Sequence, residues 1–181
     1  EFLRPLDGAI SAALDGIAYA PMAVIGMGFD KDEIGHPLDG FGFLVGMKEG
    51  RKLLGALWDS SVFKGRAPEG KCSVRSMAGG GRDNVTPLLP DGELSGLTLS
   101  ELRIMMGITG NPEMVKIFRH EKAIPMYTVG HSERLARLDA AEAKYSGLFF
   151  AGNAFRGVGL NDCVREAYAV AEKVVGAVGK S

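Results

Sequence analysis

The strongest constraint on the fold is a stretch near the C-terminus, residues 147–168, with the sequence GLFFAGNAFRGVGLNDCVREAY. Residues 148–151 are wholly apolar, which is typical of a strand buried on both faces, as in a parallel sheet. A glycine-rich turn follows. A helix is predicted over residues 161–178, because apolar residues recur there at helical spacing. The segment therefore predicts a strand, a glycine turn and a helix in succession.

This corner has the chemistry that a flat, electron-accepting ligand requires. Glycines let a ligand touch the backbone, and a helix start offers unpaired N–H groups with a partial positive charge. A flavin uses both, because its pyrimidine end gathers negative charge on reduction. The same glycines also suit a corner built for tight packing, and Asn161 and Asp162 are good helix caps in any protein. Spacing alone leaves both interpretations open.

The rest of the chain predicts a sheet with a few helices. A charged turn joins two apolar runs, as in a β-hairpin. Thr98 followed by Glu101 is typical of a capping box at a helix start. Strands are expected at residues 20–29, 41–46, 53–60, 72–80 and 115–118, and helices at residues 5–16, 98–106 and 132–144. The predicted fold class is α+β or α/β, with an antiparallel or mixed sheet ahead of the strand–helix corner.

Composition excludes several classes of function. The net charge of -1 offers no basic excess for nucleic acid. Two cysteines and three histidines without a CxxC pair predict neither a zinc site nor a disulfide framework, so we expect reduced thiols in a cytoplasmic protein and no metal. The sequence contains no run of 18 apolar residues, so no membrane-spanning helix is predicted. The chain opens without methionine, which suits a truncated or processed piece.

Four motifs in order resemble one family. The stretch FFAGNAFRGVGLNDCVREA resembles the C-terminal flavin motif of protoporphyrinogen oxidases, within the monoamine-oxidase-like flavoprotein superfamily. GFGFLVG followed by LLGALWDSSVF resembles the hairpin of their substrate domain, and SMAGGGRDN resembles the strand end after it. AIPMYTVGH resembles the segment that precedes their last helix pair. Together these matches cover most of residues 5–178.

The resemblance implies an FAD-dependent oxidase that converts protoporphyrinogen IX or coproporphyrinogen III to the porphyrin of haem biosynthesis. Residues 5–122 would form a portion of the substrate-binding domain. Residues 123–181 would form the C-terminal part of an FAD-binding domain whose N-terminal Rossmann half is absent. The implied cofactor-binding residues are Gly152, Asn153, Gly157, Val158, Gly159 and Leu160, and the implied substrate-binding residues are Gly42, Leu44, Leu57 and Met77.

No Rossmann fingerprint stands in this chain to hold the FAD pyrophosphate. Gly26-Met27-Gly28 has Lys31 in place of the third glycine, and the Gly157-Val158-Gly159 run has Asp162 there. We therefore expect the 181-residue chain alone to bind FAD weakly and to be colourless when purified.

The sequence departs from the family at several places and offers no catalytic base. His131 is interpreted as a structural residue at a helix start, and Ser132 and Met126 replace residues common in relatives. Two alternatives stay open: an amine oxidase or desaturase of the same superfamily, and a non-catalytic module without the cofactor half. The resemblance also implies a homodimer and peripheral contact with a membrane, which no segment of the chain itself indicates.

Overall fold

A computed structural model describes residues 3–179, which divide into two compact units. One unit is formed by Ala20–Ala123 and the other by the segments on either side of it. The predicted division at residues 122 and 123 lies beside this boundary. At the N-terminal end, however, the predicted stretch 5–122 does not coincide with a compact unit, because the residues before Ala20 group with the C-terminal segment.

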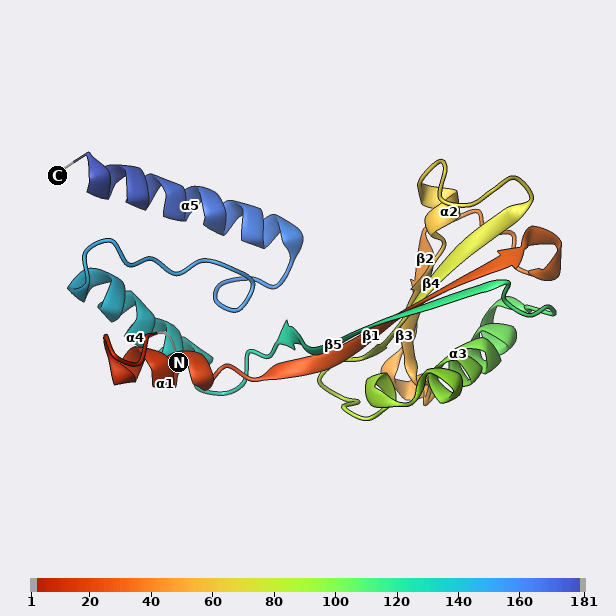
Figure 1. Ribbon diagram of the computed structural model, residues 1–181, viewed down its shortest axis with the longest axis horizontal. Coiled ribbons are helices and arrows are strands. Elements are labelled where there is room, and N and C mark those ends of the chain that lie inside the picture. The colour runs from red at the N-terminus through yellow and green to blue at the C-terminus, as the bar shows by residue number, and fades with distance from the viewer. Residues whose placement is uncertain (1–2, 180–181) are drawn as a thin grey trace. The chain divides into compact units, whose positions relative to one another are not determined.

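The unit Ala20–Ala123 is built on a five-stranded sheet, shown in Figure 1, with the strand order β2-β3-β4-β1-β5. Strand β1 pairs with β4, β4 with β3, and β3 with β2, each antiparallel. This confirms the α+β class. The strands are β1 (Tyr19–Asp30), β2 (Gly42–Leu44), β3 (Leu53–Leu57), β4 (Lys71–Gly79) and β5 (Met114–Pro125).

Burial alternates over most of the length of the two long central strands. On β1, Ala23, Ile25, Met27 and Phe29 are fully buried, whereas the residues between them are half-buried. A period of two is what a strand with one covered face requires. The covering element is helix α3 (Asp91–Met106), whose Leu94 and Leu102 join the same core. Short helical turns complete the unit: η1 (Lys31–Glu33), η2 (Met47–Glu49), α2 (Asp59–Val62) and η3 (Thr86–Leu88).

The capping box predicted at Thr98 is wrong. Helix α3 begins at Asp91, so Thr98 lies inside it, where its Oγ1 donates a hydrogen bond to the carbonyl of Leu94 at 2.8 Å. The Glu101 carboxylate does not reach back to a helix start. It accepts hydrogen bonds from the backbone N–H groups of Lys52 and Leu53, both at 3.0 Å, and so fixes β3 to the helix.

In its described residues, the second unit contains three helices: α1 (Gly8–Asp15), α4 (His131–Lys144) and α5 (Leu160–Val178). Helix α1 joins α4 through Asp7, whose carboxylate accepts hydrogen bonds from Lys144 Nζ at 3.0 Å and Tyr145 Oη at 2.9 Å. These bonds explain why the N-terminal residues belong with the C-terminal segment. A small core of apolar side chains lies between them, made of Ile10, Ala13, Leu138, Ala141 and Phe150.

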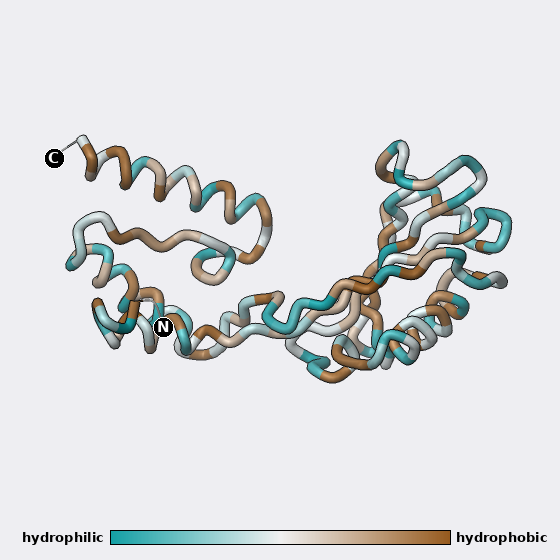
Figure 2. Tube along the Cα trace, viewed as in Figure 1, coloured by the Kyte–Doolittle hydropathy of each residue, from teal (hydrophilic) through white to brown (hydrophobic). Residues whose placement is uncertain are grey.

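The strand predicted at residues 148–151 is not present as a strand within the described part of the chain. A strand needs a hydrogen-bonded neighbour, whereas the Phe150 N–H of this segment donates to the Glu142 carboxylate at 2.8 Å. On α5, two of the apolar residues that recur at helical spacing, Val164 and Val174, are exposed, and Figure 2 shows hydrophobic residues along that helix. Among residues 3–179, no helix is both long and apolar enough to cross a membrane.

Candidate functional site

The four predicted substrate-binding residues lie together on the face of the sheet that α3 leaves open. Gly42 pairs with Leu57, Leu44 pairs with Gly55, and Gly55 pairs with Met77. Paired residues in an antiparallel sheet present their side chains to the same face. The four positions therefore occupy two neighbouring rows on this face, which we call the open face.

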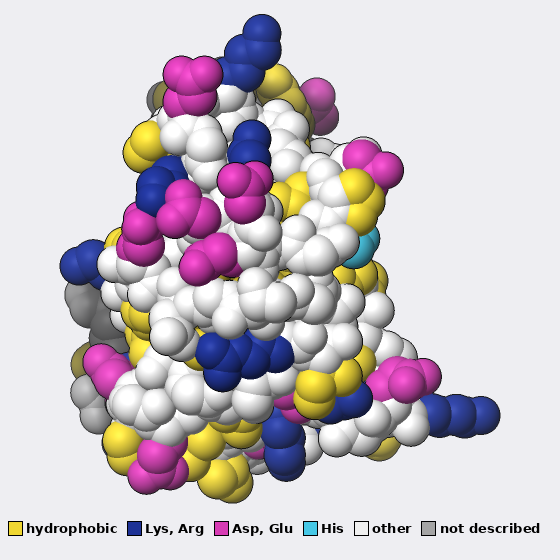
Figure 3. Space-filling view, turned by 90° about the vertical axis from the view of Figure 1, so that its right-hand side faces the viewer, with side chains coloured by type: hydrophobic (Ala, Val, Ile, Leu, Met, Phe, Trp, Pro, Cys, Tyr) yellow, Lys and Arg dark blue, Asp and Glu magenta, His cyan; other side chains and the backbone are white. Residues whose placement is uncertain are grey.

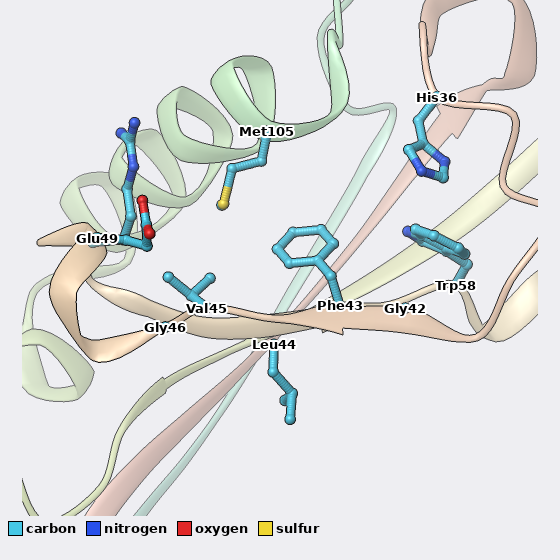
Figure 4. A pocket seen from close by; sticks show the side chains of 10 residues that line it. His36, Gly42, Phe43, Leu44, Val45, Gly46, Glu49, Trp58 and Met105 are labelled. Carbon is cyan, nitrogen blue, oxygen red and sulfur yellow. The ribbon is translucent and has the colours of Figure 1, made fainter.

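Leu44 shows the two sides of the sheet most clearly. In Figure 4 its side chain points away from the side where Phe43, Val45 and Met105 lie. The Leu44 side chain is 82% exposed. A single exposed leucine is common on protein surfaces and needs no explanation. Leu44 is not isolated, however, because Leu57 and Met77 are half-buried on the same face and Phe118 of β5 is exposed.

Two of the glycines beside these residues have a packing reason. A Cβ at Gly42 would clash with the Ala56 carbonyl and come within 2.8 Å of Leu57 Cδ2, and φ at Gly42 is +154°. A Cβ at Gly55 would clash with the Phe43 carbonyl. Each glycine therefore lets strands β2 and β3 of the edge hairpin pack closely. The glycines add no side chains that would cover the neighbouring leucines.

A separate cavity of about 570 Å³ lies on the α3 side of the β2 hairpin (Figure 4). The His36 and Trp58 rings contact each other there at a tilt of 39°, with ring centroids 4.4 Å apart, and the Trp58 Nε1 is buried without a hydrogen-bond partner among the described residues. Gly42 and Leu44 line part of this cavity, but Leu57 and Met77 do not. The four predicted substrate residues therefore lie together on the open face and not in this cavity.

The predicted cofactor residues lie in one segment of the other unit, made of the loop 152–159 and of Leu160, the first residue of α5. We call this segment the candidate flavin loop. Tyr127 fixes this loop, because its hydroxyl donates to the Asn153 carbonyl at 2.8 Å and accepts from the Gly157 N–H at 2.8 Å. His131 stacks on Tyr127 with centroids 4.0 Å apart, and its Nε2 lies 2.9 Å from the Phe155 carbonyl oxygen. Three backbone groups of the loop are thus held by two side chains.

Glycine is required at two positions of this loop for different physical reasons. A Cβ at Gly157 would clash with the Asp162 side chain, so packing alone explains that glycine. Gly152 has φ +132° with nothing within 4 Å of its Cβ position, so its backbone conformation requires glycine. Of the two interpretations of these glycines, ligand approach and tight packing, tight packing accounts for Gly157.

The start of α5 fits a ligand with a partial negative charge. Gly159 is the N-cap and makes no side-chain cap hydrogen bond, so the first N–H groups of the helix have no side-chain acceptor there. Val158 and Leu160 are exposed beside these groups, Leu160 by 80%. Exposed N–H groups between apolar side chains suit the edge and plane of a flavin ring. The Asp162 carboxylate in the first turn is paired with Arg165 Nη2 at 2.6 Å, which offsets its charge.

Ion pairs hold the loop between α4 and α5. Arg156 pairs with Asp139 of α4 and, at 3.7 Å, with Glu166 of α5. Glu142 pairs with Lys173 at 2.8 Å. Burial by itself raises the pKa of Glu142, but the hydrogen bonds from Lys173 and the Phe150 N–H outweigh it and lower that pKa below its usual value.

Comparison with known proteins decides the family. A family model described as flavin containing amine oxidoreductase matches residues 1–175. The chain belongs to this family. The match confirms the family predicted from the motifs. It also supports FAD as the cofactor, because members of this family contain flavin.

Curated relatives of this flavin-containing amine oxidoreductase are named as porphyrinogen oxidases. The coproporphyrinogen III oxidase of Propionibacterium freudenreichii subsp. freudenreichii is 32% identical over 178 residues, which is 98% of this chain and 33% of that protein. The mitochondrial protoporphyrinogen oxidase of Nicotiana tabacum is 31% identical over 162 residues, 88% of this chain and 32% of that protein. The chain thus spans about a third of the length of the curated relatives it matches.

Solved structures agree on the fold. One from Exiguobacterium sp. 255-15, whose name assigns it to the protoporphyrinogen oxidases, has a TM-score of 0.75 and 28% identity, covering 90% of this chain and 36% of that chain. A reduced UDP-galactopyranose mutase has a TM-score of 0.60 at 16% identity, covering 78% of this chain and 29% of that chain, which shows the fold alone.

Sequence reasoning missed Tyr127, the side chain with the most bonds to the candidate flavin loop. The motif AIPMYTVGH contained it, but only the resemblance drew attention to that segment. Its role depends on a contact across 26 and 30 residues of sequence, which no local pattern indicates. His131, interpreted as structural, does contact the loop through its imidazole.

Proposed function

We propose that this chain supplies the substrate-facing sheet and the flavin-facing loop of an FAD-dependent oxidase acting on protoporphyrinogen IX or coproporphyrinogen III. The observation that carries the proposal is the open face, where Gly42, Leu44, Leu57 and Met77 gather although α3 covers the opposite side. The porphyrinogen oxidase names of the relatives support the substrate class.

The open face suits a large, flat, apolar ring system. Leucine and methionine side chains offer apolar area that is removed from water when a macrocycle covers them, and methionine adapts to the shape of its partner. The glycine positions between them keep the surface low, so that the ring can approach the sheet. These residues would bind and orient the macrocycle and exclude water from it.

The candidate flavin loop would contribute backbone groups. The N–H groups at the start of α5 would face the pyrimidine edge, while Val158 and Leu160 would contact the ring plane. Tyr127 and His131 would keep the loop in place by their bonds to Asn153, Gly157 and Phe155. A bound flavin supplies the electron acceptor for the removal of hydrogens from the macrocycle.

The chain offers no side chain that we assign as a catalytic base. Among the described residues, His131 is the histidine nearest to the candidate loop, and its Nε2 is engaged with the Phe155 carbonyl. Its other ring nitrogen is buried without a partner. The basic group that receives the substrate proton therefore stays unassigned. A homodimer and a peripheral membrane contact stay predictions of the resemblance, and a cytoplasmic location stays a prediction from the two cysteines.

The test uses the full-length polypeptide that contains this chain. We expect a yellow protein with bound FAD that converts one or both porphyrinogens to the fluorescent porphyrin. Visible absorbance measures the flavin, and porphyrin fluorescence measures the reaction. A flavin-loaded protein that leaves both porphyrinogens unchanged and oxidises an amine or a carotenoid precursor would contradict the proposal and favour the alternative branch of the superfamily.

A further inference from the structure

A charged side chain stands within the open face. Arg75 of β4 pairs with Leu57 of β3 and with Gly26 of β1. One row of the open face is therefore Gly42, Leu57, Arg75 and Gly26, and the row beside it is Leu44, Gly55, Met77 and Val24. The arginine is thus a direct neighbour of the residues predicted to contact the substrate.

The surface beside Arg75 is bare. A Cβ at Gly26 would meet only the Lys116 carbonyl, at 3.9 Å, so the described neighbours would admit a side chain there. The backbone at Gly26 is not in the left-handed region either. Glycine inside a strand weakens it and often marks a place where a ligand approaches the backbone. The row therefore offers a cation next to open sheet surface.

The guanidinium of Arg75 has donors to spare. Its Nη2 bonds to Asp59 Oδ1 of α2 at 2.9 Å, and its Nε is shielded from solvent without a partner among the described residues. The side chain is 42% exposed, so its outer edge can be reached. A guanidinium carries five N–H donors in a planar fork that matches a carboxylate. Asp59 engages one nitrogen through a single oxygen, which leaves room for a second carboxylate.

Resting on the proposed function, we propose that Arg75 binds a propionate carboxylate of the porphyrinogen and so determines specificity for acidic tetrapyrroles. Both candidate substrates combine an apolar ring system with propionate side chains. The open face matches that combination, with the arginine bordering Leu57 and Met77. Asp59 holds the guanidinium in position when no substrate is bound and competes with the incoming carboxylate for it.

The competing explanation is that the ion pair only joins α2 to β4. Two substitutions in the full-length holoenzyme separate the explanations, because each breaks the pair from a different side. Arg75→Met removes the cation, whereas Asp59→Asn keeps it and removes the competing charge. The assay follows porphyrin fluorescence with the free-acid porphyrinogen and with the same porphyrinogen as its methyl ester.

We expect Arg75→Met to raise KM for the free acid by about 10- to 100-fold, the range of a charge-assisted hydrogen bond, with a much smaller change in kcat. Arg75→Lys keeps the charge without the fork and should give an intermediate KM. Asp59→Asn should not raise KM. With the ester, wild type and Arg75→Met should have the same KM.

A KM that rises equally in Arg75→Met and Asp59→Asn would overturn the inference, as would an equal loss with acid and ester. If Arg75→Met does not fold, the comparison of Arg75→Lys with wild type on both substrates carries the test. A wild-type holoenzyme that oxidises neither porphyrinogen would instead contradict the proposed function. An active wild type with an unchanged Arg75→Met variant would contradict this inference alone.

Discussion

Strand β4 contributes to two unlike surfaces. Cys72, Val74 and Ala78 face α3 and are buried in the core, whereas Arg75 and Met77, which alternate with them, face away and stay half-exposed. A buried side assembled from close-packed side chains gains stability from every methylene. A side left uncovered gains nothing comparable and still carries large apolar residues.

Residues of the covered side hold the fold, whereas residues of the open face stay accessible. Burial raises the pKa of the Cys72 thiol, which marks it as an inert residue of the covered side. In the space-filling view of Figure 3, acidic and basic side chains are interspersed among hydrophobic ones, in keeping with the net charge of -1. The open face itself is defined by two apolar rows, which contain a single arginine, Arg75, beside Leu57.

The largest effect is expected on the covered side. Phe29 is fully buried in β1, so Phe29→Ala should lower the free energy of unfolding by about 3–5 kcal/mol through lost burial and a cavity. Urea unfolding followed by circular dichroism measures the change. A loss below about 1 kcal/mol would show that the side beneath α3 is not the close-packed one.

On the open face, function should suffer and stability should not. Leu44→Ser should change the free energy of unfolding by less than about 0.5 kcal/mol, because the side chain is already exposed. KM for the porphyrinogen should rise about tenfold in the full-length enzyme, since a contact worth about 1.5 kcal/mol is lost.

The matched control is Ile104→Ser, an exposed aliphatic residue of α3 in the same unit. We expect no change in KM for this variant. Equal effects at positions 44 and 104 would remove the distinction between the two sides.

The candidate flavin loop gives a smaller effect. Tyr127→Phe removes one hydroxyl that joins Asn153 to Gly157 and should weaken FAD binding by about 3- to 10-fold, the worth of a typical hydrogen bond. Equilibrium dialysis of the full-length protein measures the affinity. Tyr168→Phe, on the exposed side of α5, is the control that should bind FAD as wild type does. An unchanged affinity in Tyr127→Phe would separate the loop from the cofactor.

The smallest effect concerns acid stability of the unit that contains α1. Hydrogen bonds from Lys144, the Ala9 N–H and Tyr145 lower the pKa of Asp7 to about 2. A depressed carboxyl pKa gives stability that is present above the unfolded pKa, about 4, and is lost as the pH falls toward about 2. Wild type should therefore lose more stability than Asp7→Asn over that window. Urea midpoints at several pH values measure it, and parallel curves would contradict the assignment.

Much of the sheet could be predicted from the sequence, because strands with one covered face repeat every two residues. The alternation along β1 and β4 and the charged turn of the hairpin are local signals. The start of α3 could not be predicted, since the Thr98–Glu101 pair imitates a capping box. The Glu101 carboxylate instead accepts hydrogen bonds from Lys52 and Leu53 at the start of β3, almost 50 residues away in sequence.

The corner near residues 147–160 was predicted in part. Helix α5 follows from its apolar spacing, but the apolar run before it forms no strand within the described residues, because strand pairing depends on a neighbour that a local pattern cannot supply. The predicted substrate residues came from the resemblance. Their common face depends on the register of three strands, and the place of Arg75 beside them follows only from that register.

Occupancy of the open face by a porphyrin tests the central claim most directly. In the full-length holoenzyme, the Leu44→Cys and Ile104→Cys variants are treated with a thiol reagent, with and without saturating porphyrin product, and the parent enzyme corrects for Cys72 and Cys163. The account predicts that the porphyrin slows labelling at position 44 and leaves labelling at position 104 unchanged. Equal labelling rates at position 44 with and without bound porphyrin would contradict it.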